Sequence, residues 1–191
     1  ATGRCNAFTG IGDPYLAFRE ILSQLGGEIE GALRAGALGS EQASRLWSLT
    51  PDTCLALAEV GPDLVGAMID PKELLARAEA AAPPGAAWAA RVQELVAARE
   101  RRPAPDMEQP ALFQQLTAVL QRLALAHPLV LILEDLHWAD AASLSLLFHL
   151  GAHLAADRIL MLGAYRPGTA GAADTHEGLD TIVHEIQSGH G

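Results

Sequence analysis

The clearest pattern in the chain is an unbroken apolar run from Leu129 to Leu133. Pro128 precedes this run, and two carboxylates, Glu134 and Asp135, follow it directly. An apolar run of this length is typical of a strand that is buried on both faces of a parallel sheet. Ligands bind beyond the carboxyl ends of the strands in such sheets, so the two carboxylates are predicted to face a ligand crevice.

Two further patterns predict neighbouring strands. Residues 1–8 are rich in small side chains and predict a brief strand that runs into a loop around Gly10-Ile11-Gly12. This loop lacks the spacing and the lysine of a phosphate-binding loop, which favours a plain turn. A second apolar run, residues 158–167, predicts another parallel strand, joined to the first run by one helix in a right-handed crossover. Together the patterns predict an α/β fold with a short parallel sheet flanked by helices.

Apolar residues at helical spacing predict three helices around these strands. Asp13 is expected to cap the first helix, with Pro14 in its first turn. The second helix ends before Pro128, because a residue that precedes proline avoids the helical conformation. The third follows Asp140, which fits a helix N-cap, with a catalytic part for this carboxylate as the alternative. The three apolar stripes are, in order, Tyr15, Leu16, Phe18, Ile21, Leu22 and Leu25; Leu112, Phe113, Leu116, Val119, Leu120 and Leu123; and Leu144, Leu147, Phe148 and Leu154.

A large all-helical insertion is predicted between the first strand and the Leu129 run. Short helical patterns alternate with glycine and proline there, with one helix after Ser40 and a separate one from Thr50-Pro51. Asp70-Pro71-Lys72-Glu73 has the sequence of a capping box, and Pro83-Pro84-Gly85 ends the helix that follows it. These breaks predict several short helices in place of one long helix.

The same pattern predicts a division of the chain into three segments. Residues 1–27 form a strand and a helix of the core, residues 28–106 form the helical insertion, and residues 107–191 form the other half of the core. A polar, proline-rich link ends the insertion. Trp47 and Trp88 are interpreted as core anchors of the inserted helices.

Composition places the chain among globular proteins and narrows its partners. Half of its 191 residues are hydrophobic and 19% are charged, with a formal net charge of -10. An acidic chain is poorly suited to neutralise nucleic-acid phosphates, so direct nucleic-acid binding is not expected. Two cysteines are too few for a disulfide scaffold, and no apolar run approaches the roughly 20 residues that cross a bilayer. These features predict a cytoplasmic protein without a membrane span.

The C-terminal residues offer little chemistry. Leu179, Ile182, Val183 and Ile186 suggest a short helix. His176, His184 and His190 are too far apart for zinc ligands on one helix face, which favours scattered surface histidines.

The residues that close the Leu129 run carry a resemblance to a known family. Leu133-Glu134-Asp135-Leu136-His137-Trp138-Ala139-Asp140 resembles the (D/E)DLHWAD signature of one branch of AAA-type ATPases. This branch is the STAND class of signalling P-loop ATPases, which includes the ATPase domains of large LuxR-type transcriptional regulators and those fused to some nucleotide cyclases. Gly3-Arg4-Cys5 and the loop after it look like the strand and helix start that follow a Walker A helix. The resemblance covers about residues 1–25 and 107–187, and matches the insertion only loosely.

The resemblance implies ATP and Mg²⁺ as cofactors of the intact parent and roles for three residues. Glu134, where aspartate is commoner, would help to hold Mg²⁺ through its waters. Asp135 would share the ion and polarise the attacking water, and Arg166, at the sensor 1 position, would contact the terminal phosphate. The alternatives are carboxylates that only start the next helix and an exposed arginine that closes a strand. For His137 and Trp138, a buried, hydrogen-bonded pair that supports the acidic turn stands beside contact with nucleotide.

A P-loop is missing from the sequence. It requires a glycine-rich turn that ends in Gly-Lys-Ser or Gly-Lys-Thr, and the single lysine is Lys72, between Pro71 and Glu73. The chain also starts at Ala1 and not at Met. We therefore expect a fragment of an ATP-dependent signalling or regulatory ATPase that is inactive and without bound cofactor on its own. Its expected partners are the P-loop segment and the C-terminal effector domains of its parent.

Two other hypotheses are kept. The chain could be a non-catalytic interaction module that retains the fold without nucleotide chemistry, or a truncated product without a role of its own. The oligomeric state is open, because exposed sheet edges can pair with another copy.

Overall fold

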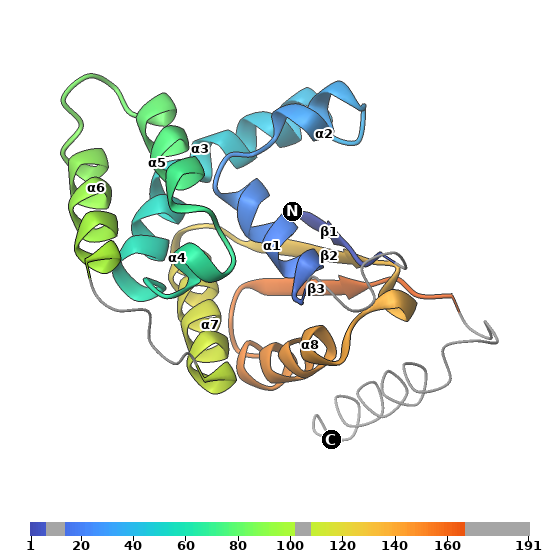
Figure 1. The fold of residues 1–191 in the computed structure, drawn as a ribbon. Helices are drawn as coiled ribbons and strands as arrows, with labels where there is room; N and C mark the ends of the chain where they lie inside the picture. The colour runs from blue at the N-terminus through green and yellow to red at the C-terminus, as the bar shows by residue number, and fades with distance from the viewer. Residues whose placement is uncertain (7–13, 102–107, 167–191) are drawn as a thin grey trace. The chain divides into compact units, whose positions relative to one another are not determined.

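The structure, a computed structural model, describes residues 1–6, 14–101 and 108–166 (Figure 1). Four predictions lie outside these residues: the plain turn at Gly10-Ile11-Gly12, the cap at Asp13, most of the proline-rich link, and the C-terminal helix with its three scattered histidines.

Contacts within the chain define two compact units. Unit 1 combines Ala1–Ile21 with the chain from Pro128 onward, and unit 2 consists of Leu22–His127. The division of an ATPase core at residues 27 and 106 stays a prediction.

Unit 1 contains a three-stranded parallel sheet. Its strands β1 (Thr2–Arg4), β2 (Leu129–Glu134) and β3 (Ile159–Gly163) lie in the order β1-β2-β3, so the strand predicted from the apolar run is the central one. Leu133 is in register with Gly3 on one side and with Gly163 on the other. The short parallel sheet with its flanking helices confirms the predicted α/β fold class.

Only one face of this sheet is buried among the described residues. Leu129, Leu131 and Leu133 of β2 are buried, whereas Val130 is 46% exposed and Leu160 and Leu162 of β3 are 54% and 46% exposed. The prediction that β2 is buried on both faces is therefore wrong. The connections from β1 to β2 and from β2 to β3 step in the same direction across the sheet, and right-handed crossovers that step in one direction cover one face. We call the other side the open face and define it by Val130, Leu160 and Leu162.

Helix α1 (Leu16–Leu25) packs closely against β1. A β-carbon placed on Gly3 would lie 1.8 Å from the carbonyl oxygen of Ala17, so the two backbones meet without room for a side chain. The helix begins later than predicted, because Tyr15 has a φ of 65° and lies with Pro14 in a turn before it. Four of the six predicted apolar positions are buried, namely Phe18, Ile21, Leu22 and Leu25.

Helix α8 (Ala141–His153) forms the crossover between β2 and β3. Its buried side includes Leu144, as predicted, together with Leu146 and Leu150, and the predicted Leu154 is buried just after the helix. Phe148 was predicted to be on this face and is exposed instead. Phe148 is two positions, or roughly half a turn of the helix, from both Leu146 and Leu150, which are fully buried.

Unit 2 consists of helices in the part that the structure describes. Helix α3 packs against α5, α6 and α7. In α4, Val65 and Gly66 have non-helical dihedral angles, so this segment is a turn more than a helix. The bounds of the elements are α2 (Glu30–Arg34), α3 (Ser40–Val60), α4 (Leu64–Ala67), α5 (Pro71–Ala81), α6 (Ala87–Glu100) and α7 (Gln109–Ala126).

Helix α3 corrects the prediction of two separate helices around Pro51. It runs unbroken for 21 residues with Pro51 in its interior. Proline lacks the N–H that would bond to the carbonyl of Trp47, which weakens the helix at this point. Burial of Leu49, Cys54 and Leu57 on either side of the proline offsets this loss, because the helix must continue to keep these side chains in the core.

The capping box predicted at the start of α5 forms only in part. Asp70 is the N-cap, Pro71 occupies the first turn, and the Asp70 side chain accepts a hydrogen bond of 2.7 Å from the backbone N–H of Lys72. Glu73 does not complete a capping box and instead contacts Arg77.

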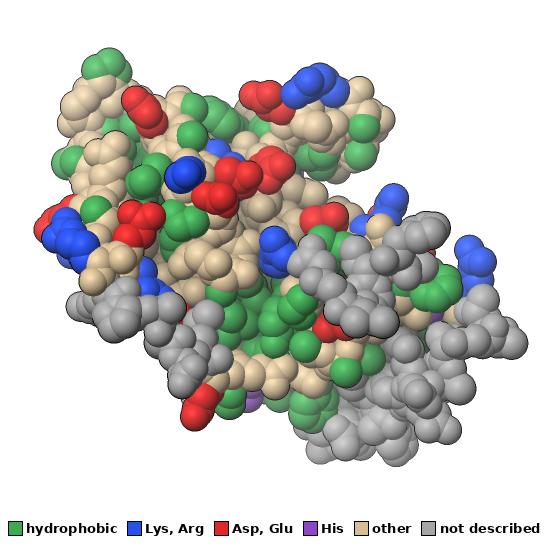
Figure 2. Space-filling model, viewed as in Figure 1, with side chains coloured by type: hydrophobic (Ala, Val, Ile, Leu, Met, Phe, Trp, Pro, Cys, Tyr) green, Lys and Arg blue, Asp and Glu red, His purple; other side chains and the backbone are tan. Residues whose placement is uncertain are grey.

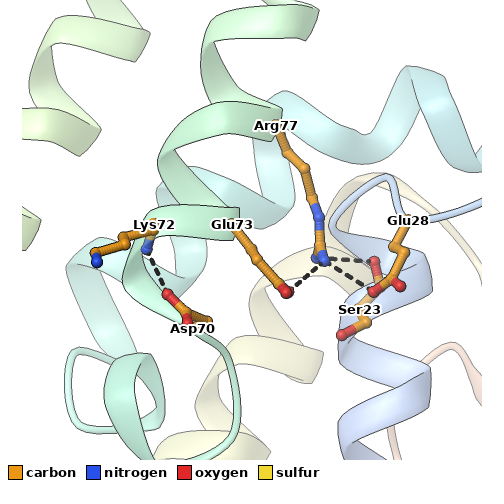
Figure 3. A network of polar contacts seen from close by, with 6 residues as sticks. All are labelled: Ser23, Glu28, Asp70, Lys72, Glu73 and Arg77. Atoms are coloured by element: carbon orange, nitrogen blue, oxygen red, sulfur yellow. Dashed lines mark hydrogen bonds and ion pairs between the residues drawn. The ribbon is translucent and has the colours of Figure 1, made fainter.

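Arg77 joins α5 to the segment that follows α1 (Figure 3). Its side chain is largely buried, and its Nη2 lies 2.8 Å from Oε2 of Glu28 and 2.9 Å from Oε2 of Glu73. Its Nη1 donates a longer hydrogen bond of 3.5 Å to the carbonyl oxygen of Ser23. A buried guanidinium with several oxygen partners links these segments of unit 2.

The surface of unit 2 carries ion pairs within single helices. Figure 2 shows basic and acidic side chains next to each other on α2, where Arg34 pairs with Glu30 at 3.2 Å. Exposed ion pairs of this kind add little to stability.

The two tryptophans of unit 2 were predicted to be core anchors. Trp47 of α3 is 40% exposed, so this prediction is wrong for Trp47, and Trp88 is half-buried.

Helix α7 confirms its predicted stripe. All six predicted residues are buried, and His127 has the extended dihedral angles expected before Pro128. Among the described residues, no helix is long and apolar enough to cross a membrane.

Candidate functional site at the carboxyl edge of the sheet

The acidic doublet, Glu134 and Asp135, lies at the carboxyl edge of the central strand. Glu134 is the last residue of β2, and its carbonyl accepts a hydrogen bond of 3.0 Å from the N–H of Cys5. Both side chains are partly exposed. Side chains alternate along a strand, so Glu134 shares the open face with Val130.

Asp135 makes the turn that ends the strand. Its φ of 57° and ψ of 38° are left-handed, which is uncommon for any residue other than glycine and costs about 1 kcal/mol. Two backbone hydrogen bonds hold the turn against β3: Ala164 N–H donates to Leu133 at 2.8 Å, and Leu136 N–H donates to Ala164 at 2.9 Å. The short 3₁₀ helix η2 (Leu136–Trp138) follows directly. Strained residues of this kind cluster at functional sites.

Arg4 is the cation that contacts the doublet. Its Nη2 and Nε lie 2.6 Å and 3.1 Å from Oε2 of Glu134, and its Nε lies 3.7 Å from Oδ2 of Asp135. The hydrogen bond to Glu134, more than the nearby charges, raises the pKa of Arg4. Sequence reasoning missed this residue, although a charge at the end of the first predicted strand was a usable signal, because parallel strands end at the same edge.

Arg166 follows the carboxyl end of β3, which lies at the same edge of the sheet as the doublet. It is exposed and follows the end of β3 by three residues, and parallel strands end at one edge. Glu134 and Asp135 each form a salt bridge with Arg4. The phosphate contact assigned to Arg166 therefore stays a prediction.

Asp140 caps α8, as predicted. Its Oδ1 accepts a hydrogen bond of 2.8 Å from the N–H of Ser143, and its Oδ2 accepts one of 2.5 Å from the hydroxyl of the same residue. The Ser143 hydroxyl oxygen also accepts a hydrogen bond of 3.2 Å from the N–H of Tyr15. The cap therefore ties the start of α8 to the turn before α1.

His137 and Trp138 differ in burial. The rings lie 5.1 Å apart at an angle of 43°, with His137 buried and Trp138 45% exposed. Nδ1 of His137 is buried and has no hydrogen-bond partner among the described residues. The prediction of a buried, hydrogen-bonded pair is therefore wrong: His137 is buried but its Nδ1 has no partner among the described residues, and Trp138 is exposed.

Cys5 is a buried thiol that follows β1 at this edge. Its thiol is buried beside Asp140, Asp135 and Glu20, and its pKa is raised from 9.0 to about 12, by desolvation first and by these carboxylates next. A thiol in this position stays protonated at neutral pH and is not a nucleophile.

The doublet fits Mg²⁺ as a partial ligand set. Mg²⁺ is usually held by one or two carboxylates together with waters and substrate phosphates. The contacts of Arg4 go to Oε2 of Glu134 and Oδ2 of Asp135, so Arg4 engages one oxygen of each carboxylate and not the other. No group of three or more potential metal ligands occurs in the described part of the chain, so phosphate and water would complete the shell.

These features define an open parallel α/β protein with its candidate site at the carboxyl edge, where this class binds ligands. A model of the AAA ATPase domain family matches residues 2–162, and the chain belongs to this family. Neither the curated proteins nor the solved structures give a match. The family match confirms the resemblance to AAA-type P-loop ATPases, and it implies that the intact domain uses a nucleotide and Mg²⁺.

Proposed function

We propose that the chain carries the Walker B strand and the sensor 1 region of a STAND-class signalling ATPase, and that it needs a P-loop from its parent to act. One observation carries this proposal: the acidic doublet closes the central parallel strand at the carboxyl edge, in a member of the AAA ATPase family. The left-handed turn at Asp135 supports it, since a plain helix start does not need a strained residue.

The proposed P-loop unit would cover the open face of the sheet. In this proposal the P-loop strand lies beside β3, and a helix connects it to β1. That connection would cross the sheet in the direction opposite to that of the two observed connections, β1 to β2 and β2 to β3. By the same handedness, its helix would cover the open face formed by Val130, Leu160 and Leu162. The N-terminus of that helix would lie at the carboxyl edge beside Glu134, and helix N-termini bind phosphates.

Three residues would then divide the chemistry. Mg²⁺, when bound, neutralises charge on the phosphate oxygens. Glu134 and Asp135 would hold the ion through its waters, and Asp135 would also accept a hydrogen bond from the attacking water and so orient it. Arg166 would donate paired hydrogen bonds to the terminal phosphate, which a planar guanidinium does better than an ammonium group.

The second candidate is a non-catalytic interaction module. It is favoured by the ion pair between Arg4 and Glu134, because a carboxylate that is already paired with a cation does not need Mg²⁺. The parent would then use the fold for assembly and not for hydrolysis.

Calorimetry with Mg²⁺ and ATP tests the proposal on the chain itself. We expect weak binding or none, because the phosphates lack P-loop amides and a lysine. Micromolar affinity would show that the P-loop is dispensable and would overturn the proposal.

The coding sequence directly upstream of Ala1 separates the two candidates. A Gly-x-x-x-x-Gly-Lys motif there supports the ATPase. A start codon at this point, with no such motif before it, supports the interaction module.

A further inference from the structure

The position of Arg4 follows from the sheet register. Arg4 and Glu134 are direct partners on neighbouring parallel strands, so their side chains leave the sheet on the same face. The backbone N–H of Arg4 donates a hydrogen bond of 2.7 Å to Oε2 of Glu20, which fixes the end of β1. The guanidinium is thereby delivered to the acidic doublet by the fold and not by a flexible loop.

The contacts of Arg4 resemble those of a bound cation. Two guanidinium nitrogens converge on Oε2 of Glu134, while Nε also lies within 3.7 Å of Oδ2 of Asp135. Two adjacent carboxylates repel each other, and a fixed positive charge compensates this repulsion. Any metal ion that approaches Glu134 meets this charge and competes for an oxygen that is already hydrogen-bonded.

We propose that Arg4 is a positioning residue that serves as the internal counter-ion of the doublet. It holds Glu134 at the edge of the sheet in the metal-free state and lowers the affinity of the doublet for a divalent ion. Its side chain is 64% exposed, so it has space to move aside when an ion binds. This inference rests on the proposed function, because it takes Glu134 and Asp135 as magnesium ligands.

The test is a Mn²⁺ titration of the chain, followed by electron paramagnetic resonance of the free ion. Arg4→Gln removes the charge and should tighten Mn²⁺ binding roughly tenfold, because the guanidinium that contacts Glu134 would no longer repel the ion. Arg4→Lys keeps the charge and should bind Mn²⁺ like the wild type. A purely structural Arg4 predicts weaker binding, or no change, for Arg4→Gln.

Two controls locate the effect. Adding Glu134→Gln to Arg4→Gln should abolish the gain, because the ion loses its ligand. Arg45→Gln removes another exposed, ion-paired arginine, which contacts Glu41 in unit 2, and should leave Mn²⁺ binding unchanged.

The outcomes separate this inference from the proposed function. If Arg4→Gln binds Mn²⁺ no tighter than the wild type, while Glu134→Gln weakens binding, the counter-ion inference is overturned and the metal-binding doublet stands. If neither Glu134→Gln nor Asp135→Asn changes Mn²⁺ binding in any background, the metal role in the proposed function is overturned as well.

A second measurement does not depend on the folding of Arg4→Gln. In the wild-type chain, Mg²⁺ should shift the NMR signal of the Arg4 Nε–H as its bond to Glu134 breaks. A signal that stays unchanged while Mg²⁺ shifts the signals of Glu134 would overturn the inference.

Discussion

The contact between β1 and α1 makes Gly3→Ala the most informative stability variant. A β-carbon at this position would lie 1.8 Å from the carbonyl oxygen of Ala17 and 2.6 Å from its carbonyl carbon. Both are backbone atoms, so no side-chain rotation relieves the clash. Strand and helix must separate by more than about 1 Å to reach normal contact distance.

We expect Gly3→Ala to lower the free energy of unfolding of unit 1 by about 3 kcal/mol, the upper end of the usual cost of overpacking. The gain from a less flexible unfolded chain, about 0.4–1 kcal/mol, is smaller. The loss should centre on the β1–β2 ladder, which includes the hydrogen bonds from Ile132 N–H to Ala1 and from Cys5 N–H to Glu134.

Amide hydrogen exchange measures this effect residue by residue. Protection of the Ile132 and Cys5 amides should fall in Gly3→Ala. Gly163→Ala is the matched control, because its β-carbon would meet only the flexible end of Leu136, at 2.7 Å. We expect that variant to change stability by less than about 1 kcal/mol. Wild-type protection in Gly3→Ala would refute the close backbone contact of β1 and α1.

Three further predictions concern single residues. Asp135→Gly should raise the free energy of unfolding by about 1 kcal/mol in thermal denaturation, since glycine adopts the left-handed turn without strain; an unchanged or lower value would contradict the assigned strain. Arg77→Ala should destabilise unit 2 by about 1–2 kcal/mol in urea denaturation, because the largely buried Arg77 side chain joins Glu28 and Glu73. The control Arg45→Ala, at an exposed arginine, should cost less than about 0.5 kcal/mol, and equal effects of the two variants would refute the stabilising role of the buried ion pairs. Native Cys5, with a pKa of about 12, should resist a thiol reagent at pH 8 until the chain unfolds, and fast labelling of the native chain at pH 8 would contradict its burial. Because its pKa is raised in the folded state, its contribution to stability should be lost as pH rises from about 9 towards 12.

Local patterns in the sequence predicted the elements whose signals are contained in one segment. The Leu129 run became the central strand, and the stripe of α7 is buried at all six predicted positions. Asp140 caps α8 because an N-cap depends on its immediate neighbours. In each case the residues that decide the structure lie within a few positions of one another.

The same local patterns could not predict features that depend on residues far apart in the sequence. Helix α3 continues through Pro51 because tertiary burial on both sides outweighs a local break. One side of β2 is exposed, and an apolar run carries no information about which faces of a sheet are covered.

The candidate site shows the same limit. Glu134 and Asp135 could be selected from their own segment, whereas Arg4 reaches them from a strand 130 positions away in sequence. Only the register of the parallel sheet brings the cation and the doublet together.

The central claim is that the acidic doublet acts on a nucleotide bound by a P-loop elsewhere in the parent. The most direct test is steady-state ATP hydrolysis by the longest natural protein that contains this chain, compared with its Asp135→Asn variant. We predict that the variant still binds ATP while its kcat falls by about 100-fold or more, because the attacking water loses the carboxylate that orients it. A variant that hydrolyses ATP at the wild-type rate would contradict the account.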